Sequence, residues 1–159
     1  MRRSVSLAFA FAVMASPLAS QGAHPNFAGK WTLDPANSTA GPMTPTAMSL
    51  AITQDDKTVN VESDATTSIG EQKASQGINL DGSPTKNTVT GGDQSIDLVS
   101  TAAWEGETLV VTTKAQVQGQ DLQQVDRWTL EPDGKTLDMA RSLNIAGQSL
   151  DVKLVFKKA

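Results

Sequence analysis

The sequence contains no cysteine, no tyrosine and only one histidine, His24. Without cysteine the chain has neither a disulfide nor a thiolate site, so its stability must come from its core alone. His24 lies near the N-terminus, where we expect a frayed segment, and no second histidine is present for a catalytic triad, a haem or a histidine-rich metal site. We therefore expect a protein that is not an enzyme and that holds no metal and no cofactor.

Long apolar runs are also missing, except for one short run near the N-terminus. Arg2 and Arg3 are followed by apolar residues from Val5 to Ala15 and then by small residues. This order is typical of a secretory signal peptide, and the run is too short to span a membrane as a helix. We expect residues 1–22 to be a signal peptide, cleaved somewhere between positions 15 and 24. The protein should then be secreted or periplasmic and not membrane-spanning.

The charge balance excludes two classes of partner. The net charge is −4, and the loss of Arg2 and Arg3 with the signal peptide makes it more negative by two. An acidic surface repels nucleic acid and anionic lipid, so we expect neither as a main partner. The remaining residues, 23–159, have the ordinary length of a single domain.

Short stretches of alternating apolar and polar residues fill residues 23–159 and are separated by turn signals. No window after the signal peptide shows sustained helical periodicity, so the alternation predicts β-strands. The expected strands cover residues 29–34, 47–54, 58–63, 71–80, 85–90, 95–104, 108–117, 122–130, 136–145 and 150–156. Consecutive hairpins without a long crossover predict an all-β fold. We expect an up-and-down antiparallel meander of about 8–10 strands that closes into a barrel.

Turn signals in the C-terminal half predict how these strands pair. Gly119-Gln120 and Gly147-Gln148 each have glycine first, which is the type II′ pattern. Val117 should then pair with Leu122, and Ile145 with Leu150. Two further turns should join Trp104 to Leu109 and Leu130 to Leu137. This register places the apolar residues of every strand from Ile96 to Phe156 on one face.

A belt of polar residues crosses that apolar face. In the expected register Asp126 lies opposite both Thr113 and Arg141, Thr113 lies opposite Ser100, and Gln124 lies one step away. A lone buried charge is very costly, so Asp126 and Arg141 should pair. Two interpretations stay open: a structural ion pair, or a ligand-binding patch inside a pocket. The candidate ligand-binding residues are Ser100, Thr113, Gln124, Asp126, Trp128, Met139 and Arg141.

Three stretches carry a resemblance to a known family. FAGKW, from Phe27 to Trp31, resembles the G-x-W opening of lipocalin-like barrels. DRWTLEPDGKTLDMAR and AAWEGETLVVTTK resemble hairpins of small exported bacterial lipocalin-like proteins of unknown role. The resemblance covers Phe27 to Lys157. It implies a calycin-type barrel that binds small apolar molecules in a central cup, with Trp31 and Phe27 at its closed end.

The resemblance also has implications for the ligand. Relatives that bind fatty acids use an interior arginine with a tyrosine nearby, and they carry a helix pair after the first strand. Arg141 would fill the first role, but the chain has no tyrosine, and PANSTAGPMTP after the first strand is too rich in proline and glycine for a helix pair. The basic partner of the closed-end tryptophan comes from near the end of the barrel in lipocalins, whereas Arg141 lies on the penultimate expected strand.

These observations lead to two expectations of function. The first is an exported lipocalin-like protein that binds a small amphipathic or apolar molecule in the barrel, with Arg141 meeting its polar group. The alternative is a filled barrel that acts as a structural or protein-interaction module without a small ligand.

Overall fold

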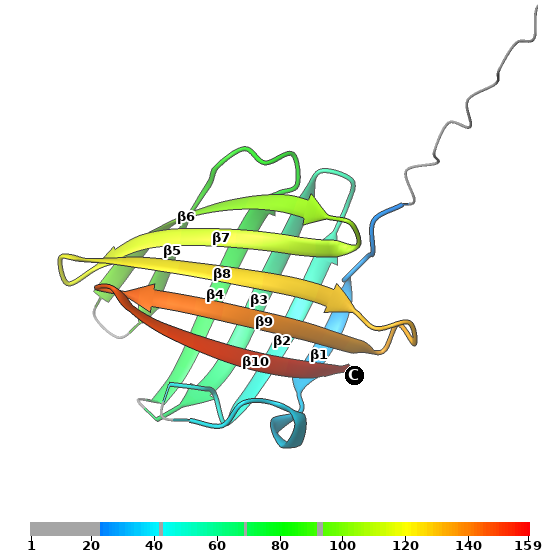
Figure 1. Cartoon of the computed structure of the whole chain (residues 1–159), viewed down its shortest axis with the longest axis horizontal. Coiled ribbons are helices and arrows are strands. Elements are labelled where there is room, and N and C mark those ends of the chain that lie inside the picture. The colour runs from blue at the N-terminus through cyan, green and yellow to red at the C-terminus, as the bar shows by residue number, and fades with distance from the viewer. Residues whose placement is uncertain (1–22, 42, 69, 92–93) are drawn as a thin grey trace, which may run out of the picture.

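A computed structural model describes residues 23–41, 43–68, 70–91 and 94–159. In these residues the chain forms ten β-strands and one short 3₁₀ helix (Figure 1). The elements are β1 (Gly29–Leu33), η1 (Pro35–Asn37), β2 (Ala47–Gln54), β3 (Thr58–Thr67), β4 (Gly70–Asn79), β5 (Thr85–Gly91), β6 (Gln94–Glu105), β7 (Thr108–Val117), β8 (Gln120–Leu130), β9 (Thr136–Ile145) and β10 (Gln148–Lys158). The expected signal peptide, residues 1–22, lies outside the described residues and stays a prediction.

The strands form one antiparallel sheet that curls into a nearly closed barrel. Their order is β4-β3-β2-β1-β10-β9-β8-β7-β6-β5, so consecutive strands pair except β4 and β5, and β1 also pairs with β10. In Figure 1, β6 to β10 form the nearer layer and β1 to β4 cross behind them. Trp31 of β1 pairs with Lys158 of β10, which joins the two layers on one side. The expected all-β, up-and-down meander is confirmed.

The other side of the barrel, between β4 and β5, is joined by side chains rather than by a backbone ladder in the described residues. Asn87 of β5 accepts a hydrogen bond from the N–H of Gly77 at 2.8 Å and donates to its carbonyl at 2.9 Å. Farther along, the N–H of Asn79 donates to Oγ1 of Thr85 at 3.0 Å. The amide of Asn87 thus takes the place of a neighbouring peptide group.

The turn between β7 and β8 differs from the sequence expectation. Val117 pairs with Gln120, so the expected pairing with Leu122 is wrong. The two turn residues are Gln118 and Gly119, with φ angles of 53° and 78°. Two successive positive φ angles are typical of a type I′ turn, in which glycine stands second rather than first.

The turn between β9 and β10 repeats this difference. Ile145 pairs with Gln148 rather than with Leu150, because Ala146 and Gly147 form the turn with φ angles of 52° and 83°. In both hairpins the pairing has moved by two residues. A shift of two keeps every side chain on its expected face, since side chains alternate with a period of two.

The shift changes which residues of the polar belt face one another. Asp126 lies opposite Val111, not opposite Thr113, which pairs with Gln124. The expected pairings of Asp126 with Arg141 and of Thr113 with Ser100 are confirmed. The pairings of Trp104 with Leu109 and of Leu130 with Leu137 are confirmed as well.

Burial changes along the barrel axis. At one end the inward-facing side chains are buried and form the core, namely Phe27, Trp31, Leu33, Leu50, Ile52, Val59, Ile78, Leu109, Trp128, Leu137, Leu154 and Phe156. At the other end the inward-facing side chains are partly exposed, namely Ala65, Ala74, Val89, Ile96, Leu98, Ala115, Val117, Leu122, Leu143, Ile145 and Leu150. The barrel is therefore packed at its first end and reached by solvent at its second. No helix in the described part of the chain is long and apolar enough to cross a membrane.

Candidate functional site

The closed end of the barrel contains two aromatic residues of the FAGKW motif. Phe27 and Trp31 have exposed fractions of 0% and 1%. The indole Nε1 of Trp31 donates to the carbonyl oxygen of Phe27 at 2.8 Å, and the Phe27 ring meets the Trp128 ring edge-on at 5.7 Å. The segment before β1 therefore plugs this end of the barrel.

His24 is ordered against the barrel, so the expectation that it lies in a frayed segment is wrong. Its ring stacks on Trp104 with 4.1 Å between centroids and 5° between planes. Gln54 holds the same segment, because its Oε1 accepts from the N–H of Phe27 and its Nε2 donates to the carbonyl of Pro25. These contacts come from β2 and β6, and the local sequence around His24 carries no signal of them.

Lys158 is a basic residue that the sequence analysis did not single out. Its Nζ lies 5.3 Å from the centre of the Trp31 ring, within the range of a cation–π contact. Lys158 reaches this position because β10 pairs with β1 and places it opposite Trp31. The position of Lys158 at the end of the last strand is the feature of the sequence that could have identified it as the basic partner of Trp31. Arg141, by contrast, lies on β9 opposite Val152 of β10, and it bonds to Asp126 rather than to Trp31.

Asp126 and Arg141 form an ion pair inside the barrel. Nε of Arg141 donates to Oδ1 of Asp126 at 2.7 Å, and Nη2 donates to Oδ2 at 3.1 Å. The two side chains are 9% and 25% exposed, respectively. Gln124 adds a third donor, because its Nε2 bonds to Oδ2 of Asp126 at 2.7 Å. The carboxylate is thus held by three hydrogen bonds, two of them from the charged guanidinium of Arg141.

The environment of Arg141 keeps it charged. Burial lowers the pKa of its guanidinium, but the charge of Asp126 and the hydrogen bonds to its carboxylate outweigh this effect, so the pKa is raised above its ordinary value. Nη2 also lies 3.7 Å from the sulfur of Met139. Arg141 therefore lies against the polarizable sulfur of Met139 on its closed-end side and bonds to the Asp126 carboxylate at its head.

The rest of the belt is neutral. Ser100 and Thr113 are buried, and their hydroxyl oxygens lie 2.9 Å apart in a hydrogen bond. Trp128 follows Asp126 by two residues on the same face, and its buried Nε1 has no hydrogen-bond partner in the described residues. A buried indole N–H usually has a partner, so the Nε1 of Trp128 departs from this rule within the closed-end core.

We use the name cup for the solvent-reached end of the barrel. Its floor is the belt of Ser100, Thr113, Gln124, Asp126 and Arg141. Its walls are apolar side chains in two rows of paired residues: Leu98, Ala115, Leu122 and Ile145 in one, and Leu143 and Leu150 in the row that contains Ser100. These wall residues are partly or fully exposed although they point inward. An apolar wall above a polar floor is the usual layout of a small-molecule site.

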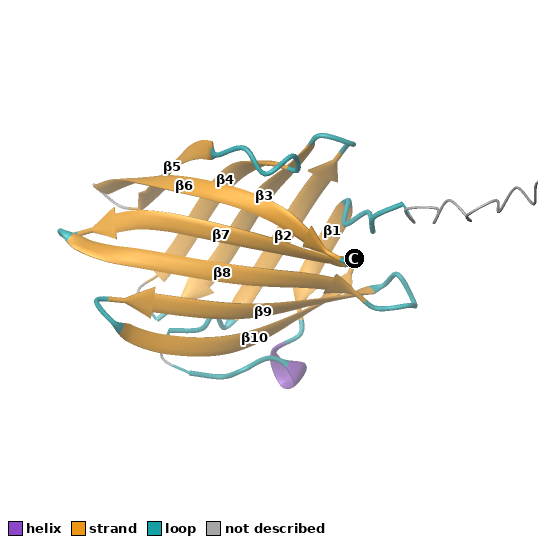
Figure 2. Cartoon of the chain, turned by 45° about the horizontal axis from the view of Figure 1, so that its top comes forward, coloured by secondary structure: helices purple, strands orange, loops and turns teal. Residues whose placement is uncertain are grey.

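No helix pair covers the cup in the described part of the chain. The segment after β1 forms only the three-residue helix η1, and then lies along the edge of β10 (Figure 2). The N–H of Val155 donates to Oγ of Ser38, and the N–H of Lys153 donates to Oγ1 of Thr39, each at 2.9 Å. The side chains of this segment thus accept hydrogen bonds from backbone N–H groups at the edge of β10 rather than form a lid over the cup.

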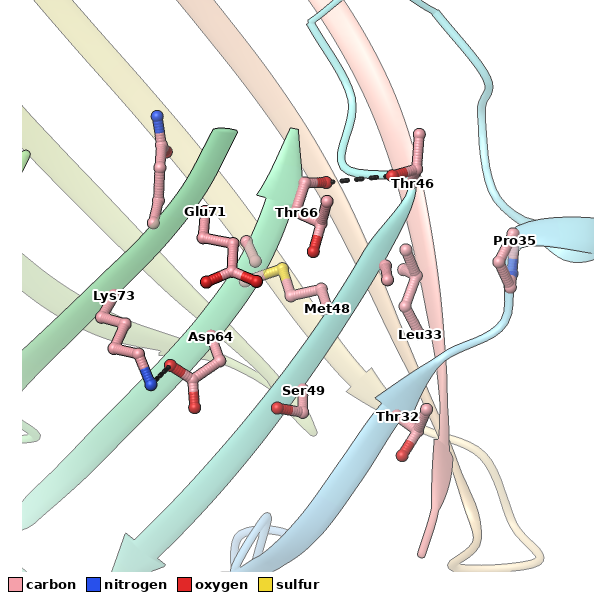
Figure 3. A pocket seen from close by; sticks show the side chains of 13 residues that line it. Thr32, Leu33, Pro35, Thr46, Met48, Ser49, Asp64, Thr66, Glu71 and Lys73 are labelled. Atoms are coloured by element: carbon pink, nitrogen blue, oxygen red, sulfur yellow. Dashed lines mark hydrogen bonds and ion pairs between the residues drawn. The ribbon is translucent and has the colours of Figure 1, made fainter. Parts of the chain in front are cut away.

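A hollow of about 430 Å³ lies beside β1 to β4 near the loop that follows β1 (Figure 3). Leu33 and Met48 contribute apolar surface to it, and Asp64 and Lys73 pair beside it at 2.9 Å. The two charged side chains are 59% and 79% exposed. Water screens the charges of such an exposed pair, so the pair would add little to the affinity for a ligand. The cup, with its buried belt, is the stronger candidate site.

Metal-binding chemistry finds no support in the described residues, where no group of three or more His, Asp or Glu side chains is placed to hold an ion. The candidate site therefore offers hydrogen bonds, one neutralised ion pair and apolar surface. This chemistry suits reversible binding of an organic molecule.

Solved structures match the fold, although no protein-family model and no curated protein matches the sequence. The zebrafish ileal bile acid-binding protein complexed with cholic acid has a TM-score of 0.54 at 13% identity, covering 84% of this chain and 98% of that one. A mutant of the fluorescent protein UnaG has a TM-score of 0.53 at 15% identity, covering 84% and 96%. A secretory abundant heat soluble protein from Ramazzottius varieornatus has a TM-score of 0.56 at 10% identity, covering 84% and 95%. The expected lipocalin-like barrel is thus confirmed, and at these identities the likeness shows the fold alone.

Proposed function

We propose that this protein is an exported carrier that binds a small amphipathic or apolar molecule in the cup. The observation that carries the proposal is the burial gradient along the barrel. The inward-facing residues Leu98, Leu122 and Ile145 are only partly buried, whereas their counterparts at the closed end are fully buried. Apolar side chains that face inward and still meet water are a surface that an apolar molecule can cover.

The solved relatives in fold support the same proposal, because one of them holds cholic acid, which is a small amphipathic molecule. Export and a bacterial source rest on the sequence alone, on the pattern of residues 1–22 and on the resemblance of the hairpins. The proposal is for binding rather than catalysis, since the belt contains no histidine or cysteine and its one carboxylate, Asp126, is bonded to Arg141 and Gln124.

A pair of substitutions on β7 tests whether the cup is the site. Ala115 points inward at the cup and is partly exposed, while its neighbour Lys114 points outward and is exposed. Ala115→Trp should fill the cup and abolish the binding of an apolar fluorescent probe. Lys114→Trp adds the same ring to the outer face and should leave binding unchanged.

Native mass spectrometry of protein purified from its own source gives a second, independent readout. A co-purifying mass of lipid size, retained by wild type and by Lys114→Trp but lost from Ala115→Trp, is the expected result. If neither the probe nor any co-purifying molecule binds, the proposal fails. The barrel would then be the filled structural or protein-interaction module that the sequence analysis kept as its alternative.

A further inference from the structure

We infer that the cup selects uncharged amphiphiles, whose head group is a hydroxyl or carbonyl, over carboxylates. This inference rests on the proposed function, because it names the class of ligand that the same cup takes. The observation behind it is that the interior arginine already has an internal counter-ion. Arg141 gives Nε and Nη2 to Asp126 at 2.7 and 3.1 Å, so its positive charge is matched before any ligand arrives.

The cup holds no second charge to attract an anion. Among the described residues that face the cup, Asp126 and Arg141 are the only ionisable side chains, since Lys158 lies over Trp31 at the closed end. The acidic and basic residues next to them in sequence, such as Arg127, point outward and are exposed. The floor of the cup is therefore neutral overall, and a ligand meets it as a set of hydrogen-bonding groups.

A carboxylate at this floor would face two costs. If it approached Arg141 beside Asp126, two like charges would share one partner. If it displaced Asp126, that carboxylate, which is 9% exposed, would remain in the barrel with only Gln124 as a donor. A buried charge that loses its partner is strongly unfavourable. Either route weakens the binding of an anion relative to that of a neutral molecule with the same apolar body.

An uncharged oxygen meets neither cost. A guanidinium has five N–H donors, and the bonds to Asp126 use two of them, so Arg141 can still donate to a neutral oxygen while the ion pair stays intact. A hydroxyl can also donate in return to a carboxylate oxygen of Asp126. The apolar walls of the cup then cover the body of the molecule.

The test compares 1-dodecanol, methyl dodecanoate and dodecanoate as competitors of an apolar fluorescent probe on the full mature chain at neutral pH. The partition coefficient of each compound into neutral detergent micelles measures the transfer of its apolar body alone. Each ratio of affinities for the protein is therefore divided by the corresponding ratio of partition coefficients. After this correction we expect both neutral compounds to bind at least about tenfold more tightly than dodecanoate. This comparison needs no variant, so it stands even if substitutions in the belt unfold the protein.

Asp126→Asn then tests whether the ion pair is the cause. The substitution frees the charge of Arg141, so dodecanoate should bind at least about tenfold more tightly than it does to wild type, while 1-dodecanol should change by less than about threefold. The matched control is Asp64→Asn, which breaks the exposed ion pair with Lys73 on the outer face and should change neither affinity.

Each outcome has a distinct meaning. Dodecanoate binding as tightly as the neutral compounds to wild type would overturn the inferred selectivity and leave the carrier function in place. Dodecanoate binding that stays weak in a folded Asp126→Asn variant would also overturn it, because the ion pair would not be the cause. Failure of the probe and all three compounds to bind would refute the proposed function and this inference together.

Discussion

Removing the charges of Asp126 and Arg141 one at a time and then together measures what the ion pair contributes to stability. Loss of one partner from a buried pair costs about 3–5 kcal/mol. Because a quarter of the Arg141 side chain is exposed, water offsets part of this cost, and we expect each single substitution to cost about 2–4 kcal/mol. Arg141→Met should lie at the upper end of this range, since it strands the less exposed Asp126.

The double substitution should be milder than either single one. Asp126→Asn with Arg141→Met removes both charges, leaves no buried ion, and places an apolar side chain beside Met139. We expect a cost of about 1 kcal/mol, so the coupling energy of the pair should be at least about 3 kcal/mol. The assay is equilibrium urea unfolding at neutral pH. The slope of the free energy of unfolding against urea concentration should be the same for wild type, the two single variants and the double variant.

An exposed pair provides the matched control for this cycle. Asp64 and Lys73 bond at 2.9 Å on the outer face, but their side chains are 59% and 79% exposed. The effects of Asp64→Asn and Lys73→Met should therefore add without measurable coupling. If the effects of Asp126→Asn and Arg141→Met also add, the two residues do not stabilise each other, and the reasoning about a buried pair is refuted.

Three further predictions concern the closed end, one turn and the N-terminus. Trp31→Ala should cost about 3–5 kcal/mol because it removes a 1% exposed side chain and leaves a cavity; an unchanged melting temperature would contradict this. Asp133 accepts hydrogen bonds from the N–H groups of Lys135 and Thr136, which lower its pKa, so Asp133→Ala should destabilise the fold at neutral pH and lose its effect as the pH falls through that lowered pKa. Urea unfolding across acidic pH tests it, and a constant difference would count against it. Intact mass of exported protein should show an N-terminus between residues 16 and 25; full-length protein confined to the cytoplasm would exclude export.

The faces of the strands could be predicted from the sequence, because alternation is a local property of each strand. Asp126, Arg141 and Trp128 were expected on the inner face, and the structure places them there. The pairing across two hairpins could not be predicted, because Gly119 and Gly147 suit either position of a two-residue turn. The two turn types differ in the φ angle of the preceding residues, Gln118 and Ala146, which is positive in the structure. Glutamine and alanine have no preference for a positive φ, so the sequence does not indicate it.

Contacts between segments far apart in the sequence were harder still. The stacking of His24 on Trp104 joins residues from the N-terminal segment and β6, and no periodic pattern links them. The same holds for the bonds of Ser38 and Thr39 to β10, which depend on where β1 ends. These contacts form only once the barrel has brought the segments together, so they are consequences of the topology rather than of local sequence.

The boundary between β4 and β5, which the amide of Asn87 bridges, is a weakly bonded part of the barrel wall. Neighbouring strands elsewhere in the sheet are joined along ladders, whereas Asn87 fastens β5 to β4 through two hydrogen bonds to Gly77. Separating the strands at this boundary breaks few bonds, so the wall can widen transiently without unfolding, and amide protons beside it should exchange with solvent sooner than those of β8 or β9. The same amide occupies the N–H and C=O of Gly77, which would otherwise be open to a strand of another molecule. The Asn87 side chain thus joins β5 to β4 loosely enough for the strands to separate transiently, and it also occupies the backbone groups of Gly77 that could otherwise pair with another molecule.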